Sequence, residues 1–254
     1  MQTASMPHMI LFDYGDTLLC EPDWNPLRGE EALFQYIKTN KRNLSPREVC
    51  DYSLQLFGQI GLARSHGFEI HNHAFQKLLY ESLEIELTIS YPEAEKIFWD
   101  HATPGAVMPQ AATMLDAINA LGIRSGVISN ISFSGAALAQ RLHRLLPNNR
   151  FEFIIASSEY VFRKPSRLLF ELALKKAGLS ALEVWFCGDN AKADIEGAAQ
   201  AGIFPVWYEH ASADTAKQKA AVKKPDCEHL HIHEWKELMG VLENIGGNSA
   251  VNKA

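Results

Sequence analysis

Several short apolar segments of the chain lead into polar or charged residues that could do chemistry together. In chain order these residues are Asp13, Ser129, Asn130, Lys164, Asp189 and Asp194. A carboxylate can attack phosphorus and carry it as an aspartyl-phosphate, and a few carboxylates with other oxygen donors form the kind of set that Mg²⁺ prefers. A lysine beside them would neutralise the nucleophile and the phosphoryl oxygens, and such electrostatic stabilisation is often the largest catalytic contribution. The combination favours phosphoryl transfer.

Five of these six residues can be given a role in such a reaction from their chemistry alone. Asp13 is the candidate nucleophile, Asp13 and Asp189 could share a Mg²⁺, and Lys164 would balance their charge. Ser129, Asn130 and free backbone N–H groups would hold the phosphoryl oxygens. Taken singly, an acid that ends a strand is usually a turn or helix-cap residue, and Ser129-Asn130 would be an ordinary turn. The site is therefore inferred from the order and combination of the residues.

The elements that would position these residues alternate between strands and helices. Five apolar segments, each too short for a core helix, are typical of buried strands: 9–12, 125–129, 151–157, 184–188 and 204–208. Helical patterns lie between them, at 109–122, 135–146, 165–178 and 193–202. This alternation predicts an α/β fold with a doubly wound parallel sheet covered on both faces. Ligands of such sheets bind beyond the carboxyl ends of the strands, so the candidate residues would meet at one edge.

Residues 22–104 interrupt this alternation. They contain several amphipathic helical patterns and no convincing apolar strand. We therefore expect a core domain formed by residues 1–21 and 105–245, with an inserted helical cap domain at 22–104. The cap would move about hinges near Pro22 and Pro104 and exclude water from the site. The small, polar residues 246–254 are expected to form a disordered tail.

Composition narrows the class of protein. The chain has 254 residues, of which 47% are hydrophobic and 21% charged, and its net charge is -6, which disfavours nucleic acid or an anionic membrane as a partner. Four scattered cysteines and an N-terminus without a secretion-signal pattern lead us to expect a cytoplasmic protein.

The segment 229–235 (HLHIHEW) alternates like an edge strand, and we expect its histidines to pack rather than to bind a metal. No sequence feature specifies an oligomeric state.

Four motifs carry a family resemblance: DYGDT (13–17), VISN (127–130), RKP (163–165) and GDNAKAD (188–194). In this order the chain resembles the haloacid dehalogenase (HAD)-like hydrolase superfamily, in the subgroup with a helical cap between the first and second motifs. The resemblance implies a Rossmann-like core and a Mg²⁺-dependent phosphatase of a small phosphorylated metabolite. It assigns the nucleophile to Asp13 and phosphate binding to Thr17, Ser129, Asn130 and Lys164. It assigns the metal site to Asp13, the Gly15 carbonyl, Asp189 and Asp194.

The chain departs from the family pattern at Gly15. Family phosphatases usually have there a second aspartate, which protonates the leaving oxygen and then activates the hydrolytic water. Asp16 comes one residue later, so its side chain should point elsewhere. Gly15 keeps the backbone carbonyl that the family uses as a metal ligand. Since general acid–base catalysis typically contributes about 10²–10⁴-fold, a phosphatase without this group would be slow, unless its leaving group needs no proton or a cap residue supplies one.

Three other interpretations follow from this departure. A phosphonate hydrolase would use a cap lysine in place of the aspartate, and four are available: Lys38, Lys41, Lys77 and Lys96. A haloacid dehalogenase would need no Mg²⁺, although the presence of both Asp189 and Asp194 weighs against it. A third possibility is a regulatory protein that binds phosphate and metal and turns over poorly.

Overall fold

The computed structural model describes residues 5–210 and 224–251. Its core is a six-stranded sheet with the order β10-β9-β8-β1-β6-β7, in which every neighbouring pair is parallel. The strands are β1 (Met9–Phe12), β6 (Arg124–Ser129), β7 (Phe151–Ala156), β8 (Val184–Gly188), β9 (Phe204–Tyr208) and β10 (Leu230–Ile232). The predicted α/β fold with a parallel sheet is confirmed.

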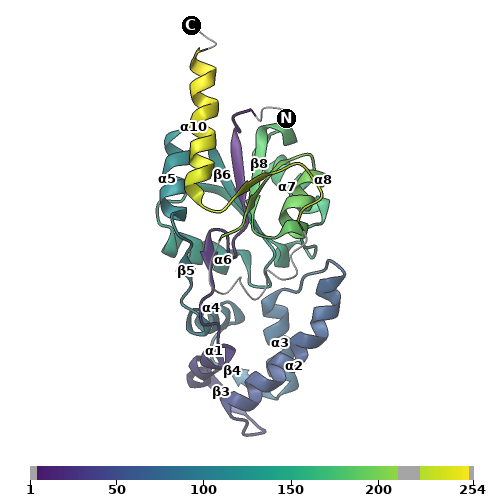
Figure 1. The fold of residues 1–254 in the computed structure, drawn as a ribbon. Coiled ribbons are helices and arrows are strands. Elements are labelled where there is room, and N and C mark those ends of the chain that lie inside the picture. Colours follow the sequence, from purple (N-terminus) through teal and green to yellow (C-terminus); the bar gives the residue numbers. More distant parts are fainter. Residues whose placement is uncertain (1–4, 211–223, 252–254) are drawn as a thin grey trace.

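Helices cover both faces of this sheet (Figure 1). They are α5 (Ala111–Ala120), α6 (Gly135–Leu145), α7 (Arg167–Ala177), α8 (Gly197–Gln200) and α10 (Trp235–Val251), with the π-helix η4 (Ala191–Glu196) and the short 3₁₀ turns η2 (Ser157–Glu159) and η3 (Ala181–Glu183). Successive side chains of a strand point to opposite faces. In β1, Ile10 and Phe12 accordingly pack in one apolar cluster, and Met9 and Leu11 in another. Burial on both faces explains why β1 is apolar throughout.

The C-terminal segment differs from expectation. Helix α10 continues to Val251, so the prediction of a disordered tail is wrong for residues 246–251, and residues 252–254 lie outside the described residues. The apolar residues Trp235, Leu238 and Leu242 of this helix are fully buried against the core. A helix anchored by such packing can extend through glycines that would not favour it locally.

The inserted segment forms a second layer below the sheet edge (Figure 1). It contains α1 (Pro26–Leu33), the 3₁₀ turn η1 (Phe34–Tyr36), β3 (Ile37–Asn40), α2 (Pro46–Ser65), α3 (Asn72–Ser82), β4 (Ile85–Leu87) and α4 (Tyr91–Ala102). Serine–glutamate capping boxes begin α2 and α4, and an apolar core of its own holds the helices together. The expectation of a cap without strands is wrong, because β3 and β4 pair as an antiparallel ribbon.

The cap is joined to the core by a second ribbon. Strand β2 (Leu19–Cys20) leaves the core and pairs antiparallel with β5 (Ala106–Val107), which returns to it. The two chain crossings therefore lie side by side, next to the expected boundaries at 22 and 104. Among the described residues, none of the helices is both long enough and apolar enough to cross a bilayer.

A buried acid lies inside the cap. Glu30 is 2% exposed, and Tyr80 Oη donates a hydrogen bond to its Oε2 at 2.9 Å. Burial raises the pKa of Glu30 to about 7, although the hydrogen bond from Tyr80 opposes this. Glu30 is therefore protonated in the folded protein under conditions in which it is ionised in the unfolded chain.

The folded protein should lose stability as the pH rises from about 5 to above 7. The unfolded chain releases the Glu30 proton first, so it binds fewer protons than the folded state across this window. A pKa difference of this size corresponds to up to about 3 kcal/mol in the free energy of unfolding. Urea unfolding at several pH values should show this decline, and Glu30→Gln should flatten it while keeping an acceptor for Tyr80. Parallel pH curves for the two proteins would contradict the prediction.

Candidate active site

The candidate site residues lie at the carboxyl edge of four adjacent strands. Asp13 follows β1, Asp189 follows β8, and Ser129 ends β6, while Lys164 comes from the loop after β7. Asp13 N donates to Cys187 O at 2.9 Å, which continues the sheet ladder one residue beyond β1. Parallel pairing thus brings together residues that are far apart in sequence, as expected for an open α/β sheet.

Lys164 is the centre of the cluster. Its Nζ lies 2.8 Å from Asp13 Oδ1 and 2.6 Å from Asp194 Oδ1, and the side chain is almost completely buried. Burial alone would lower the pKa of Lys164, but the charges of Asp13 and Asp194 outweigh it and raise the pKa. A charged lysine beside the carboxylate of Asp13 suits the binding of an anionic group.

Three carboxylates meet beside this lysine. Oxygens of Asp13, Asp189 and Asp194 lie within 4.8 Å of one another. Burial, together with the neighbouring carboxylates, raises the pKa of Asp189, and burial also raises the pKa of Asp194 despite the contact with Lys164. Like charges held this close favour an additional cation, and an all-oxygen set suits Mg²⁺. The chemistry of this cluster therefore fits the implied metal.

The oxygens of Asp194 already have partners. Oδ1 contacts Lys164, and Oδ2 accepts a hydrogen bond from Asn190 N at 2.9 Å. The Asp194 carboxylate lies so close to the backbone of residue 188 that only glycine fits there, because a Cβ would lie 2.5 Å from that carboxylate. Asp194 thus holds Lys164 in place as well as contributing negative charge to the cluster.

The side chain of Asn130 contacts the backbone of Lys164. Its Nδ2 donates to Lys164 O at 2.9 Å, and its Oδ1 accepts from Lys164 N at 2.7 Å. Because both ends of the side-chain amide contact Lys164, Asn130 positions the backbone of Lys164, and its role as a phosphate ligand stays a prediction. Sequence spacing alone could not distinguish a ligand from a residue that orients one.

The other predicted residues lie close to Asp13 in sequence or on the neighbouring strand. Thr17 is fully buried, with no hydrogen-bond partner for Oγ1 among residues 5–210 and 224–251. Ser129 is 2% exposed at the end of β6. Gly15 does not have a left-handed backbone, and nothing lies within 4 Å of a Cβ added to it. The missing aspartate is therefore not excluded by local space.

The tip of the cap touches the core beside this site. Arg163 N donates to Gly67 O at 2.9 Å, and Asn72 N donates to Ser132 O at 2.8 Å. The buried Glu69 carboxylate forms ion pairs with Arg163, which directly precedes Lys164, and with Arg64 at 3.1 Å. Glu69 is not among the residues predicted from sequence, and its only sequence signal is an acid within a short apolar stretch between two helices.

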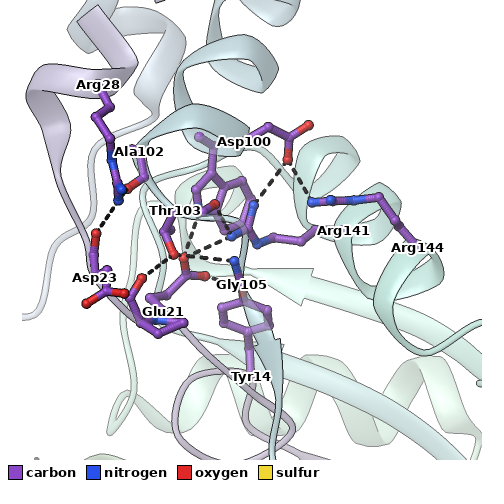
Figure 2. Close-up of polar contacts among 12 residues, drawn as sticks. Tyr14, Glu21, Asp23, Arg28, Asp100, Ala102, Thr103, Gly105, Arg141 and Arg144 are labelled. Atoms are coloured by element: carbon purple, nitrogen blue, oxygen red, sulfur yellow. Dashed lines mark hydrogen bonds and ion pairs between the residues drawn. The ribbon is translucent and has the colours of Figure 1, made fainter.

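A second polar cluster lies where the cap joins the core (Figure 2). Arg141 of α6 is buried, and its Nη2 lies 3.1 Å from Glu21 Oε2 and 2.8 Å from Thr103 O. Its Nη1 lies 3.3 Å from Asp100 Oδ1 of the cap, and the guanidinium stacks over Trp99 at 4.5 Å. The side chain of Arg141 thus binds both segments that connect the cap to the core, through Glu21 and Thr103, and also binds the last cap helix, α4.

This second polar cluster reaches the loop that carries Asp13. Tyr14, next to Asp13 in the chain, donates a hydrogen bond to Glu21, which also accepts from Trp99 Nε1 at 3.3 Å. Burial raises the pKa of Glu21, while Tyr14 and Arg141 oppose that rise. The segment that leads into the cap, the cap itself and the residue beside Asp13 are therefore held by one set of contacts.

Replacing Arg141 with methionine should destabilise the protein by about 3 kcal/mol. The change fills a similar volume but leaves the partly buried Glu21 and the Thr103 carbonyl without their cationic partner, and breaking a buried ion pair on one side carries a cost of this order. Urea unfolding measures the change in free energy.

Arg144→Met is the matched control, because Arg144 pairs with the same Asp100 at 2.7 Å from an exposed position. It should cost less than about 1 kcal/mol, as exposed ion pairs do. Equal losses in the two variants would contradict the special role of Arg141.

Comparison with known proteins agrees with the fold and the motifs. A family model described as haloacid dehalogenase-like hydrolase matches residues 8–202. The chain is 26% identical over 249 residues to a glyceraldehyde 3-phosphate phosphatase of Pyrococcus abyssi (strain GE5 / Orsay), covering 96% of this chain and 97% of that protein.

Solved structures share the same fold. A HAD phosphatase from Thermococcus onnurineus superposes with a TM-score of 0.61 at 20% identity, covering 92% of this chain and 97% of that one. A 2-haloacid dehalogenase from Pseudomonas syringae pv. Tomato DC3000 superposes with a TM-score of 0.59 at 21% identity, covering 93% and 98%. Since the family match spans the site and most of the core, this chain belongs to the haloacid dehalogenase-like hydrolases.

Proposed function

We propose that this hydrolase is a Mg²⁺-dependent phosphatase that cleaves a small phosphorylated metabolite through an aspartyl-phosphate on Asp13. The observation that carries the proposal is the contact of Lys164 Nζ with both Asp13 and Asp194, beside the third carboxylate, Asp189. This arrangement pairs a nucleophile with the positive charge that an incoming phosphoryl group needs. The named activity of the Pyrococcus abyssi relative, which matches over almost its whole length, supports a small phosphorylated substrate.

The chain's own residues account for the steps of such a reaction. An oxygen of Asp13 attacks phosphorus, the bond to the leaving oxygen breaks, and water later cleaves the bond between Asp13 and phosphorus to release phosphate. Lys164 balances the charge of Asp13 and of the phosphoryl oxygens throughout. Asp13, Asp189, Asp194 and the Gly15 carbonyl would hold Mg²⁺, which when bound supplies further positive charge to the phosphoryl group.

Position 15 determines which substrates suit this site. Glycine cannot protonate the leaving oxygen, so substrates whose leaving groups are already acidic, such as acyl or aryl phosphates, should react best. This selectivity is part of the proposal.

Two alternatives are less well supported. Three of the four candidate cap lysines for phosphonate cleavage form ion pairs with cap glutamates: Lys38 with Glu86, Lys41 with Glu84 and Lys77 with Glu81. A haloacid dehalogenase shares the fold, but a dehalogenase reaction has no use for the charge of Asp189 beside Asp194. We therefore favour phosphate esters as substrates over phosphonates and haloacids.

The discriminating experiment measures inorganic phosphate released from a panel of phosphorylated metabolites and aryl and acyl phosphates, and halide released from 2-haloacids. The proposal predicts phosphate release that requires Mg²⁺ and stops when the metal is chelated. Halide release that persists when the metal is chelated would instead show that the protein is a dehalogenase. Binding of phosphate and Mg²⁺ without turnover on any substrate would instead indicate a regulatory protein.

A further inference from the structure

A second cluster of potential metal ligands lies at the other end of the sheet edge. Ligand atoms of Glu209, His231 and His233 lie within 4.8 Å of one another. Glu209 follows β9, and His231 lies within β10, which pairs in parallel with β9 over only three residues. Two imidazoles and a carboxylate are the set that zinc and similar borderline divalent ions bind, whereas Mg²⁺ prefers oxygen.

The imidazoles are already oriented. His233 Nδ1 lies 2.9 Å from the backbone oxygen of Glu209, and a carbonyl only accepts, so Nδ1 carries the hydrogen and Nε2 is left with its lone pair. Metal-binding histidines commonly use the second ring nitrogen in this way, which fixes the tautomer. The His231 ring stacks on Trp207 with centroids 4.2 Å apart, so its plane is fixed as well.

The spacing also suits a metal. His231 Nε2 lies 3.0 Å from Glu209 Oε2. Two ligands of one tetrahedral zinc, with bonds of about 2.0–2.1 Å, lie about 3.3 Å apart. A small outward movement of either side chain would therefore admit the ion, with loss of the hydrogen between the two atoms.

We propose that Glu209, His231 and His233 form a second metal site, for Zn²⁺ or a similar borderline divalent ion, separate from the acidic cluster of the active site. With three protein ligands, the ion would keep a fourth position for water. The site would fasten the edge strand β10, and with it α10, to β9. This inference is independent of the proposed phosphatase activity.

The test is calorimetric titration of the full-length protein with Zn²⁺ in the Asp189→Asn background with Mg²⁺ in excess, so that zinc binding at the acidic cluster is suppressed. The proposal predicts one bound Zn²⁺ per chain and a higher melting temperature with Zn²⁺, because a ligand that binds only the folded state stabilises it. His233→Ala should lower the affinity by at least about tenfold, since even losing a residue that supports a ligand costs this much, and should abolish the thermal shift.

His229→Ala is the matched control. His229 belongs to the same histidine-rich segment, but its Nδ1 contacts Cys227 O at 2.8 Å, and it is not part of the cluster. It should leave zinc affinity unchanged. The proposal is overturned if no zinc binds in this background, if His233→Ala binds as tightly as its parent, or if His229→Ala loses as much affinity as His233→Ala.

Discussion

Replacing Asp13 with asparagine is expected to abolish phosphate release, with a loss on the order of 10⁴-fold or more, as for other catalytic nucleophiles. Asparagine has the same shape, but its neutral amide cannot attack phosphorus. Lys164 keeps its contact with Asp194, so the buried charge remains paired and the fold should persist. Initial rates of phosphate release with Mg²⁺ measure the effect, and a thermal melt verifies folding.

The matched control for this substitution is Asp116→Asn, on the exposed face of α5. It makes the same chemical change away from the sheet edge and should leave the rate unaltered. A folded Asp13→Asn protein that retains more than a few per cent of the rate would exclude Asp13 as the nucleophile.

Introducing aspartate at position 15 is expected to raise activity on alkyl phosphates by about 10- to 100-fold, within the usual range for general acid–base catalysis. Such leaving groups depart poorly without a proton, whereas aryl and acyl phosphates should gain little. The backbone at Gly15 is compatible with a side chain, and nothing lies within 4 Å of the added Cβ. The ratio of kcat/KM on alkyl and aryl phosphates is the measurement.

Gly15→Asn is the control for this gain, because it has nearly the same shape but cannot donate and accept the proton as a carboxyl group does. It should fold and show no gain on alkyl phosphates. If Gly15→Asp binds Mg²⁺ and also gains nothing, proton donation is not what the native site lacks. Asp16 would then be the donor to examine, and Asp16→Asn should remove the remaining activity.

The core strands could be predicted from sequence because their signal is local. The segments 9–12, 184–188 and 204–208 have the same bounds as β1, β8 and β9. These strands are buried on both faces, so every position is apolar and the pattern is unambiguous. The alternation with helices then fixes a parallel sheet.

The cap strands could not be found in this way. Strand β3 has the sequence IKTN, in which two exposed residues stand between half-buried ends. Strand β4 has the sequence IEL, in which one exposed residue stands between a buried and a half-buried residue. Each is short and is stabilised mainly by pairing with the other, with α2 and α3 between them in sequence. The sequence of either strand alone contains no information on that pairing, because these strands form through contacts between residues far apart in the chain.

The distinction between local sequence signals and long-range contacts also holds for the site. Asp13, Lys164, Asp189 and Asp194 could be placed together because the strand order brings every strand end to one edge. The partners of Arg141 could not be placed, since Glu21 and Asp100 belong to the linker and the cap. One signal was present: Arg141 lies beside Leu142 and three residues from Leu138, on the buried face of α6. A charge on an apolar face indicates a buried partner.

The paired linkers have a consequence for the order of folding. Strands β1 and β6 are neighbours in the sheet although the whole cap lies between them in sequence. Joining the ends of a long flexible segment costs conformational entropy that grows with its length. The cap has an apolar core of its own, and β2–β5 pairing brings its two ends together. A cap that forms early thus shortens the loop that β1 and β6 must close, so the sheet should assemble faster with the cap intact than with its core disrupted.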